Sequence, residues 1–99
     1  MSIKNTSLEK LRKEIDQLDL KLIDIIRKRF KVTEKVGILK TKNNLPLEDL
    51  KREKTLSSKK EKLAKKAGLK SDLIIKIFKL LIKEVKENHK RIKKGWPKR

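Results

Sequence analysis

The sequence predicts an all-α protein: a three-helix protomer with one long N-terminal helix, assembled into an intertwined helical homodimer. Apolar residues recur at spacings of three and four, as on one face of a helix, and we find no strand pattern and no internal repeat. Two short segments of turn-forming residues divide the chain into three such stretches. At 99 residues, the chain has room for a single domain, 1–99.

The first helix is expected over residues 6–42. Thr6-Ser7-Leu8-Glu9 has the pattern of a capping box, in which a Thr hydroxyl and a Glu carboxylate satisfy free amide groups at a helix start. One apolar seam then runs along the helix: Leu8, Leu11, Ile15, Leu18, Leu22, Ile25, Val32, Val36 and Leu39. The segment Asn43-Asn44-Leu45-Pro46 should end the helix, because Asn favours turns and Pro disfavours helix at the preceding residue.

A second helix is expected over residues 48–67, with Gly68 as its C-terminal stop. A third is expected over 72–94, capped by Ser71-Asp72 and carrying an apolar stripe that includes Ile74, Phe78 and Val85. Gly95-Trp96-Pro97 should end it, leaving a basic tail at 95–99.

The first predicted helix is much longer than either of the other two. A first helix of about 35 residues is about 50 Å long, and helices of about 20 residues cover this seam only if they lie end to end along it. A second copy of the chain covers it more simply. We therefore expect an intertwined homodimer whose folding is coupled to assembly.

Arg29 occupies the one position of the seam that is not apolar. A guanidinium in a buried position needs an anion, since an unpaired buried cation costs several kcal/mol; the alternative is that its long side chain reaches solvent. Lys40 lies eleven residues later on the same helix face, about 16 Å away, so both side chains could hold one small anion. Arg12 lies about 25 Å from Arg29 along the helix and could join such a site only from the partner chain.

Composition narrows the function classes. The net charge of +18 predicts an anionic partner, and only six of the 31 basic residues are Arg, the side chain that suits bidentate anion binding. The absence of Cys excludes disulfides and thiolate metal sites. No apolar run approaches the about 20 residues of a membrane span, and Met1–Ser7 lacks a signal-peptide pattern. We expect a cytoplasmic protein that does not bind membranes.

Several short motifs together resemble the all-helical chorismate mutases, from about Leu8 to His89. They are Leu11-Arg12, Ile15-Asp16, Leu18-Asp19, Arg27-Lys28-Arg29, Val36-Gly37, Lys40, Pro46, Asp49, Arg52-Glu53-Lys54 and Ile77-Phe78. Each motif is weak by itself, and their order and spacing are specific. The resemblance implies an interlocked dimer with two equivalent active sites that rearrange chorismate to prephenate on the route to phenylalanine and tyrosine.

The resemblance also implies roles for individual residues. Arg29 and Arg52 would bind the substrate carboxylates, with Arg12 reaching in from the other subunit. Lys40 would contact the ether oxygen and a carboxylate, while Glu53 and the backbone at Asp49 would hold the ring hydroxyl. This pericyclic reaction of a single dianionic substrate needs no nucleophile, metal or cofactor, and we expect none.

The sequence departs from the family near the end of the third helix. The family usually places a Gln eleven residues after Phe78, where it donates a hydrogen bond to the ether oxygen; this chain has His89 there, and Val85 where a Ser is common. An imidazole can donate in place of the amide. The other interpretations are a drifted site or a register shift that brings Asn88 into place.

Three alternative functions remain open on the sequence. An isochorismate-pyruvate lyase of the same fold uses a similar cationic pocket. A helical nucleic-acid-binding protein would explain the charge of +18, although aromatic residues for base stacking are scarce and no recognition motif is present. A regulatory homologue could bind the dianion without rearranging it.

Overall fold

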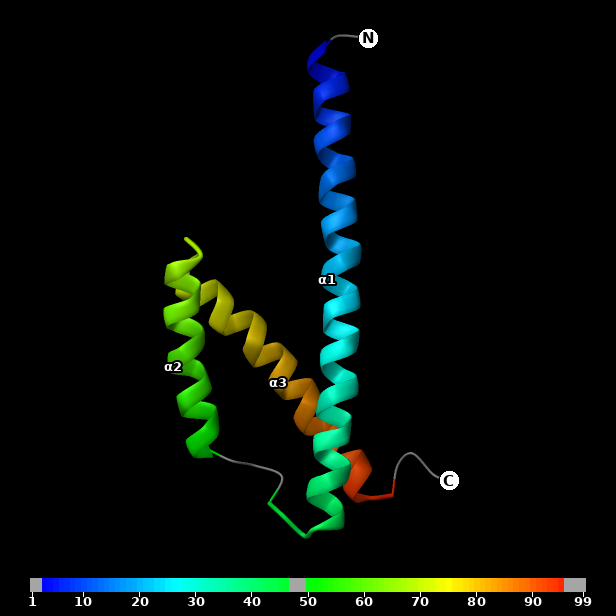
Figure 1. Ribbon diagram of the computed structural model, residues 1–99, viewed down its shortest axis with the longest axis vertical. Helices are drawn as coiled ribbons and strands as arrows, with labels where there is room; N and C mark the ends of the chain where they lie inside the picture. The colour runs from blue at the N-terminus through cyan, green and yellow to red at the C-terminus, as the bar shows by residue number, and fades with distance from the viewer. Residues whose placement is uncertain (1–2, 47–49, 96–99) are drawn as a thin grey trace. The chain divides into compact units, whose positions relative to one another are not determined.

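The computed structural model describes residues 3–46 and 50–95, with side chains described from Thr6 onward. It contains three helices, α1 (Ile3–Lys42), α2 (Leu50–Lys66) and α3 (Ser71–Lys93), and no strand among these residues (Figure 1). The predicted all-α fold class and the three helices are confirmed. None of the described helices is both long and apolar enough to cross a membrane.

Helix α1 begins before the predicted capping box. Its first residue is Ile3, so Thr6 lies inside the helix and the prediction of a start at residue 6 was wrong. No Gly or Pro separates Ile3 from Thr6. A cap is worth only about 1 kcal/mol, so a capping pattern does not stop a helix whose preceding residues can also be helical.

The C-terminal ends of α1 and α2 share one hydrogen-bonded motif. After α1, Asn44 takes a left-handed backbone conformation (φ 54°), and the amide of Leu45 donates to the carbonyl of Lys40 at 2.8 Å. After α2, Gly68 (φ 74°) takes the corresponding place, and the amide of Leu69 donates to the carbonyl of Ala64 at 2.9 Å. Both are Schellman caps, which confirms the predicted breaks at Asn43–Pro46 and Gly68.

The other observed helix ends agree only in part with the predicted ones. The predicted start of α2 at Glu48 lies outside the described residues. The N-cap of α3 is Lys70, with extended backbone and no side-chain cap, so the predicted cap by Ser71-Asp72 was wrong; Ser71 is already helical. Helix α3 ends at Lys93, close to the predicted residue 94, and Gly95 follows with φ 101°. Trp96 and Pro97 lie outside the described part of the chain.

The chain divides into two compact units, Met1–Val32 and Thr33–Arg99. In the second unit, α2 packs against α3. Ala64 and Ile92 are the buried hydrophobic residues among those described, and the ammonium of Lys60 lies 4.4 Å from the centre of the Phe78 ring. That contact is a cation–π interaction between α2 and α3. The predicted single domain stays a prediction.

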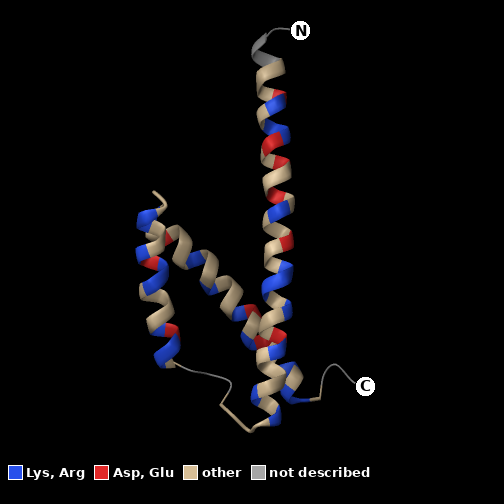
Figure 2. Ribbon diagram, viewed as in Figure 1, with Lys and Arg blue, Asp and Glu red and all other residues tan. Residues whose placement is uncertain are grey.

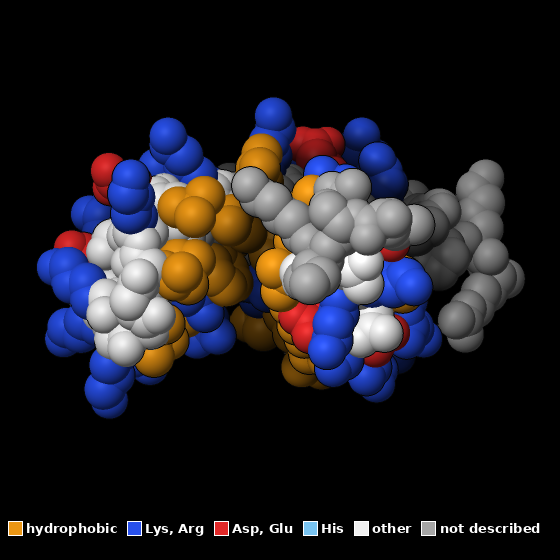
Figure 3. Space-filling view, turned by 90° about the horizontal axis from the view of Figure 1, so that it is seen from above, with side chains coloured by type: hydrophobic (Ala, Val, Ile, Leu, Met, Phe, Trp, Pro, Cys, Tyr) orange, Lys and Arg blue, Asp and Glu red, His pale blue; other side chains and the backbone are white. Residues whose placement is uncertain are grey.

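The apolar seam of α1 is exposed in the single chain. Its side chains, from Leu8 to Leu39, are between 40% and 62% exposed. Figure 3 shows hydrophobic side chains gathered on particular faces, with Lys and Arg projecting around them. Burial is worth about 25 cal/mol per Å² of apolar surface, so this single chain leaves much of its potential hydrophobic stabilisation unused.

Candidate functional site

His89 is the buried polar residue of the described chain, at 5% exposure. Its Nε2 lies 2.7 Å from the backbone carbonyl oxygen of Thr33, and both residues belong to the second unit. A carbonyl oxygen only accepts, so Nε2 carries a proton and donates it to this hydrogen bond. The bond ties the C-terminal half of α3 to the last turns of α1.

Gly37 makes this close approach possible. A Cβ atom added at Gly37 would lie 2.6 Å from Cδ2 of His89 and 3.0 Å from Cδ1 of Ile92. The first distance is shorter than carbon atoms tolerate. The Gly of the Val36-Gly37 motif is therefore required by packing, because its missing side chain leaves room for the imidazole of His89.

A second link joins α2 to α3. The ammonium of Lys86 lies 3.0 Å from Oε1 of Glu53, and the two side chains are 36% and 30% exposed. Glu53 stands in the first turn of α2, where the positive end of the helix dipole favours a carboxylate. The structure thus holds a predicted substrate-binding residue in a defined ion pair.

Other predicted site residues of the second unit lie on all three helices. Lys40 is half-buried in the last turn of α1, and Arg52 is exposed beside Glu53 at the start of α2. Val85 is half-buried on α3, one turn before His89. Asp49 lies outside the described residues. The predicted roles of these residues remain predictions.

In the first unit, α1 carries two predicted site residues, the exposed Arg12 and the half-buried Arg29. They are seventeen positions apart on one continuous helix, roughly 25 Å along its axis. One copy of α1 therefore cannot bring both to the same small anion.

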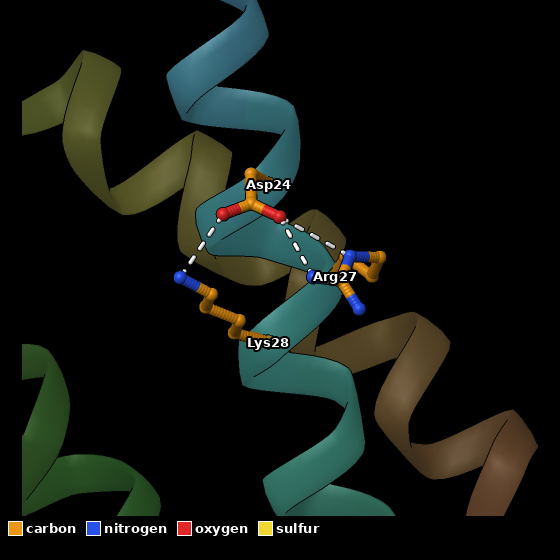
Figure 4. A network of polar contacts seen from close by, with 3 residues as sticks. All are labelled: Asp24, Arg27 and Lys28. Carbon is orange, nitrogen blue, oxygen red and sulfur yellow. Dashed lines mark hydrogen bonds and ion pairs between the residues drawn. The ribbon is translucent and has the colours of Figure 1, made fainter.

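Asp24 pairs with two cations of α1, Arg27 and Lys28. Its carboxylate accepts hydrogen bonds from Arg27 at 2.8 and 3.2 Å and forms an ion pair with Lys28 at 3.0 Å (Figure 4). The hydrogen bond from Arg27 is the largest cause that lowers the pKa of Asp24 below its usual 3.8, and the one from Lys28 is the next largest. Arg27 and Lys28 are thus engaged at the surface of their own helix.

Lys86, Thr33 and Gly37 were not predicted as parts of the site. A signal for Lys86 was present, because it lies on the half-buried stripe of α3 between Ile82 and His89. A charged residue within an apolar stripe is the same pattern that singled out Arg29. The Thr33 contact uses a backbone carbonyl, which leaves no mark in the sequence.

Comparison with known proteins gives one consistent family. Residues 11–90 match the family described as chorismate mutase type II. A chorismate mutase of Methanocaldococcus jannaschii is 33% identical over 79 residues, covering 80% of each chain. A bifunctional chorismate mutase/prephenate dehydratase of Buchnera aphidicola (subsp. Schizaphis graminum) is 37% identical over 84 residues, and the T-protein of Haemophilus influenzae is 35% identical over 78.

The extent of these matches differs. The alignments cover 85% and 79% of this chain for the Buchnera and Haemophilus proteins, but only 22% and 21% of those longer relatives. The match to the family includes α2 and most of α1 and α3. The chain belongs to the chorismate mutase type II family, as its sequence motifs predicted.

Proposed function

We propose that this protein catalyses the rearrangement of chorismate to prephenate. Family membership over residues 11–90 is the observation that carries this proposal. The reaction moves bonds within one molecule, so the protein must hold a compact conformer and stabilise negative charge on the breaking ether oxygen. Cationic side chains with fixed positions supply both.

The cations have distinct roles in this proposal. Arg29 and Arg52 bind the two carboxylates, because guanidinium groups form bidentate hydrogen bonds with carboxylates. Lys40 donates to the ether oxygen, where charge develops in the transition state. Loss of such a donor typically costs about 3 kcal/mol of transition-state stabilisation. Glu53 and the backbone at Asp49 hold the ring hydroxyl.

The site is completed by a second copy of the chain. The exposed seam of α1 offers an apolar face from Leu8 to Leu39, which a second α1 and its attached helices can cover. Arg12 then enters the site from the partner, since it is too far along α1 from Arg29 to reach the same ligand within one chain. An intertwined homodimer, in which each site draws on both chains, meets these conditions.

His89 acts in this site through its second ring nitrogen. With Nε2 donating to Thr33, a neutral imidazole has only an accepting Nδ1, whereas an imidazolium has a second N–H. Only the charged form of His89 therefore donates a hydrogen bond to the ether oxygen while keeping the Thr33 contact. Asn88 is engaged locally, because its Oδ1 accepts from Arg91 at 3.4 Å.

Nucleic-acid binding gains no support from the charge distribution. Lys and Arg are spread over all three helices, and Asp and Glu are interspersed with them along α1 (Figure 2). A nucleic-acid interface gathers basic residues on one face or stripe. The spread of the basic residues therefore favours a small anionic substrate over a nucleic acid.

The proposal is tested by following chorismate absorbance with the purified protein and two matched variants. Arg29→Ala should lower kcat/KM by at least about 100-fold, because a substrate carboxylate loses its bidentate partner. Arg27→Ala removes the same charge two residues away, from a side chain paired with Asp24, and should change kcat/KM less than about twofold. Equal turnover by Arg29→Ala and wild type would remove Arg29 from the site.

A parallel assay with isochorismate separates the mutase from the lyase. Turnover of chorismate to prephenate without pyruvate release from isochorismate is expected. Pyruvate release alone would replace the proposed activity with that of the lyase.

A further inference from the structure

The ion pair between Lys86 and Glu53 differs from the other lysine pairs of the same two helices. Lys65 and Lys90 pair with Glu61 and Glu87 of their own helices, at 3.4 and 3.6 Å, and their side chains are 71% and 64% exposed. Lys86 instead reaches from α3 to α2 at 3.0 Å and is 36% exposed. Ion pairs within one helix restrict their side chains only weakly, because both partners are exposed and the attraction between them is screened by water.

A pair between two helices restricts the carboxylate more strongly. Glu53 is anchored by its backbone in α2, and its Oε1 is held by a lysine whose backbone belongs to α3. The side chains are about one-third exposed, so water screens the pair less than a fully exposed one. Lys86 thereby restricts the orientation of the Glu53 carboxylate.

We propose that Lys86 is a positioning residue that orients Glu53 toward the ring hydroxyl of the substrate. This inference rests on the proposed chorismate mutase function and adds a residue that the family motifs did not supply. Lys86 acts through Glu53 and need not touch the substrate. Its loss should therefore matter only when Glu53 is present.

The test is a double-mutant cycle measured as kcat and KM for chorismate. Lys86→Met should lower kcat/KM about tenfold, since a misplaced contact group loses its transition-state interaction. Lys86→Arg should keep most of the activity, because it preserves the ion pair. In the Glu53→Ala background, Lys86→Met should change kcat/KM less than about twofold.

Lys90→Met is the matched control. It removes the same charge from the same helix and also breaks an ion pair, that with Glu87, and it should leave kcat/KM within about twofold of wild type. A loss as large as that of Lys86→Met would show that charge alone matters and would overturn the positioning role. The same conclusion would follow if Lys86→Arg failed to retain activity.

The outcomes separate this inference from the proposed function. An active wild type with equal Lys86→Met losses in both backgrounds overturns the inference alone. If the wild type binds chorismate without converting it, the proposed function fails, and the same cycle measured as Kd by calorimetry decides the inference. A wild type that neither binds nor converts chorismate overturns both.

Discussion

The two units of the chain obtain their order from different sources. In Thr33–Arg99, α2 packs against α3, His89 is buried against Thr33 and Gly37, and Glu53 is paired with Lys86. In Met1–Val32, the helix carries an apolar seam that is exposed along its length, and its described ion pairs lie on the helix surface. Thr33–Arg99 thus buries some side chains by contacts within the unit, although others such as Leu63 and Leu80 are more than half exposed, whereas the seam side chains of Met1–Val32 are exposed along the helix. This exposed seam is the surface that the proposed second copy of the chain would cover.

A charge placed in the seam should have the largest effect. Leu18→Glu puts a carboxylate where the proposed partner helix packs, and a buried unpaired charge costs several kcal/mol. We expect the dimer dissociation constant to rise at least about 100-fold, with loss of helicity and of mutase activity. Sedimentation velocity and circular dichroism over a range of protein concentrations measure this.

Gln17→Glu is the control for the seam variant. It introduces the same residue one position earlier, about 100° around the helix and off the seam, and should leave assembly intact. Equal assembly of Leu18→Glu and wild type would show that the exposed seam does not carry the contact.

Gly37→Ala should disrupt the contacts that the second unit makes within itself. The added methyl meets the imidazole of His89 at 2.6 Å, and such overpacking costs about 1 to 3 kcal/mol of unfolding free energy. Urea denaturation measures the change. In a His89→Ala background, the same substitution should destabilise less, because the contact at 2.6 Å is gone and the one with Cδ1 of Ile92 at 3.0 Å remains. Destabilisation of equal size in both backgrounds would contradict the steric account.

His89→Gln should raise the activity of the site. An amide has two N–H groups, so Gln can donate both to the Thr33 carbonyl and to the ether oxygen, which a neutral imidazole cannot do. We expect kcat to rise about tenfold, less than the full value of a preorganised donor. His89→Leu has neither donor and should lose activity. A His89→Gln enzyme no faster than wild type would remove this residue from the ether-oxygen contact.

Asp24 should give the smallest effect, confined to the first unit. Its pKa is lowered from 3.8 in the folded chain, so the stabilisation it contributes is complete above that value and is lost as pH falls through the lowered pKa. Asp24→Asn should therefore lower Tm slightly at pH 6, and its effect should disappear once the pH is below the lowered pKa of Asp24. Thermal melts at several pH values compare the two proteins, and an unchanged difference at low pH would contradict the ion-pair explanation.

The sequence predicted the fold where the signals were strong and local. The segment Asn43–Pro46 and Gly68 marked two helix ends correctly, and Asn44 and Gly68 take there the left-handed conformation that Asn and Gly tolerate best. The start of α1 and the cap of α3 were wrong because capping preferences are worth only about 1 kcal/mol, and helical neighbours override them. The long apolar periodicity predicted the helices correctly, whereas single capping residues did not predict their first residues.

The candidate site was less predictable than the fold. Arg29 and Lys40 could be singled out because both follow from position along one helix. The pairing of Glu53 with Lys86 joins residues 33 positions apart on different helices, and helical spacing within a segment carries no information about it. The hydrogen bond between His89 and the Thr33 carbonyl depends on the space left by the missing side chain of Gly37. Predicting it would have required knowing that these three residues lie together.

If each site is built from two copies of the chain, two variants that are inactive by themselves should complement each other in a mixed dimer. Arg12→Ala and Arg29→Ala are purified separately, unfolded, mixed in equal amounts and refolded together. If Arg12 enters from the partner, half of the dimers are mixed and each has one intact site, so activity should return to about one quarter of wild type. If the mixture stays as inactive as its two components, the shared site is contradicted.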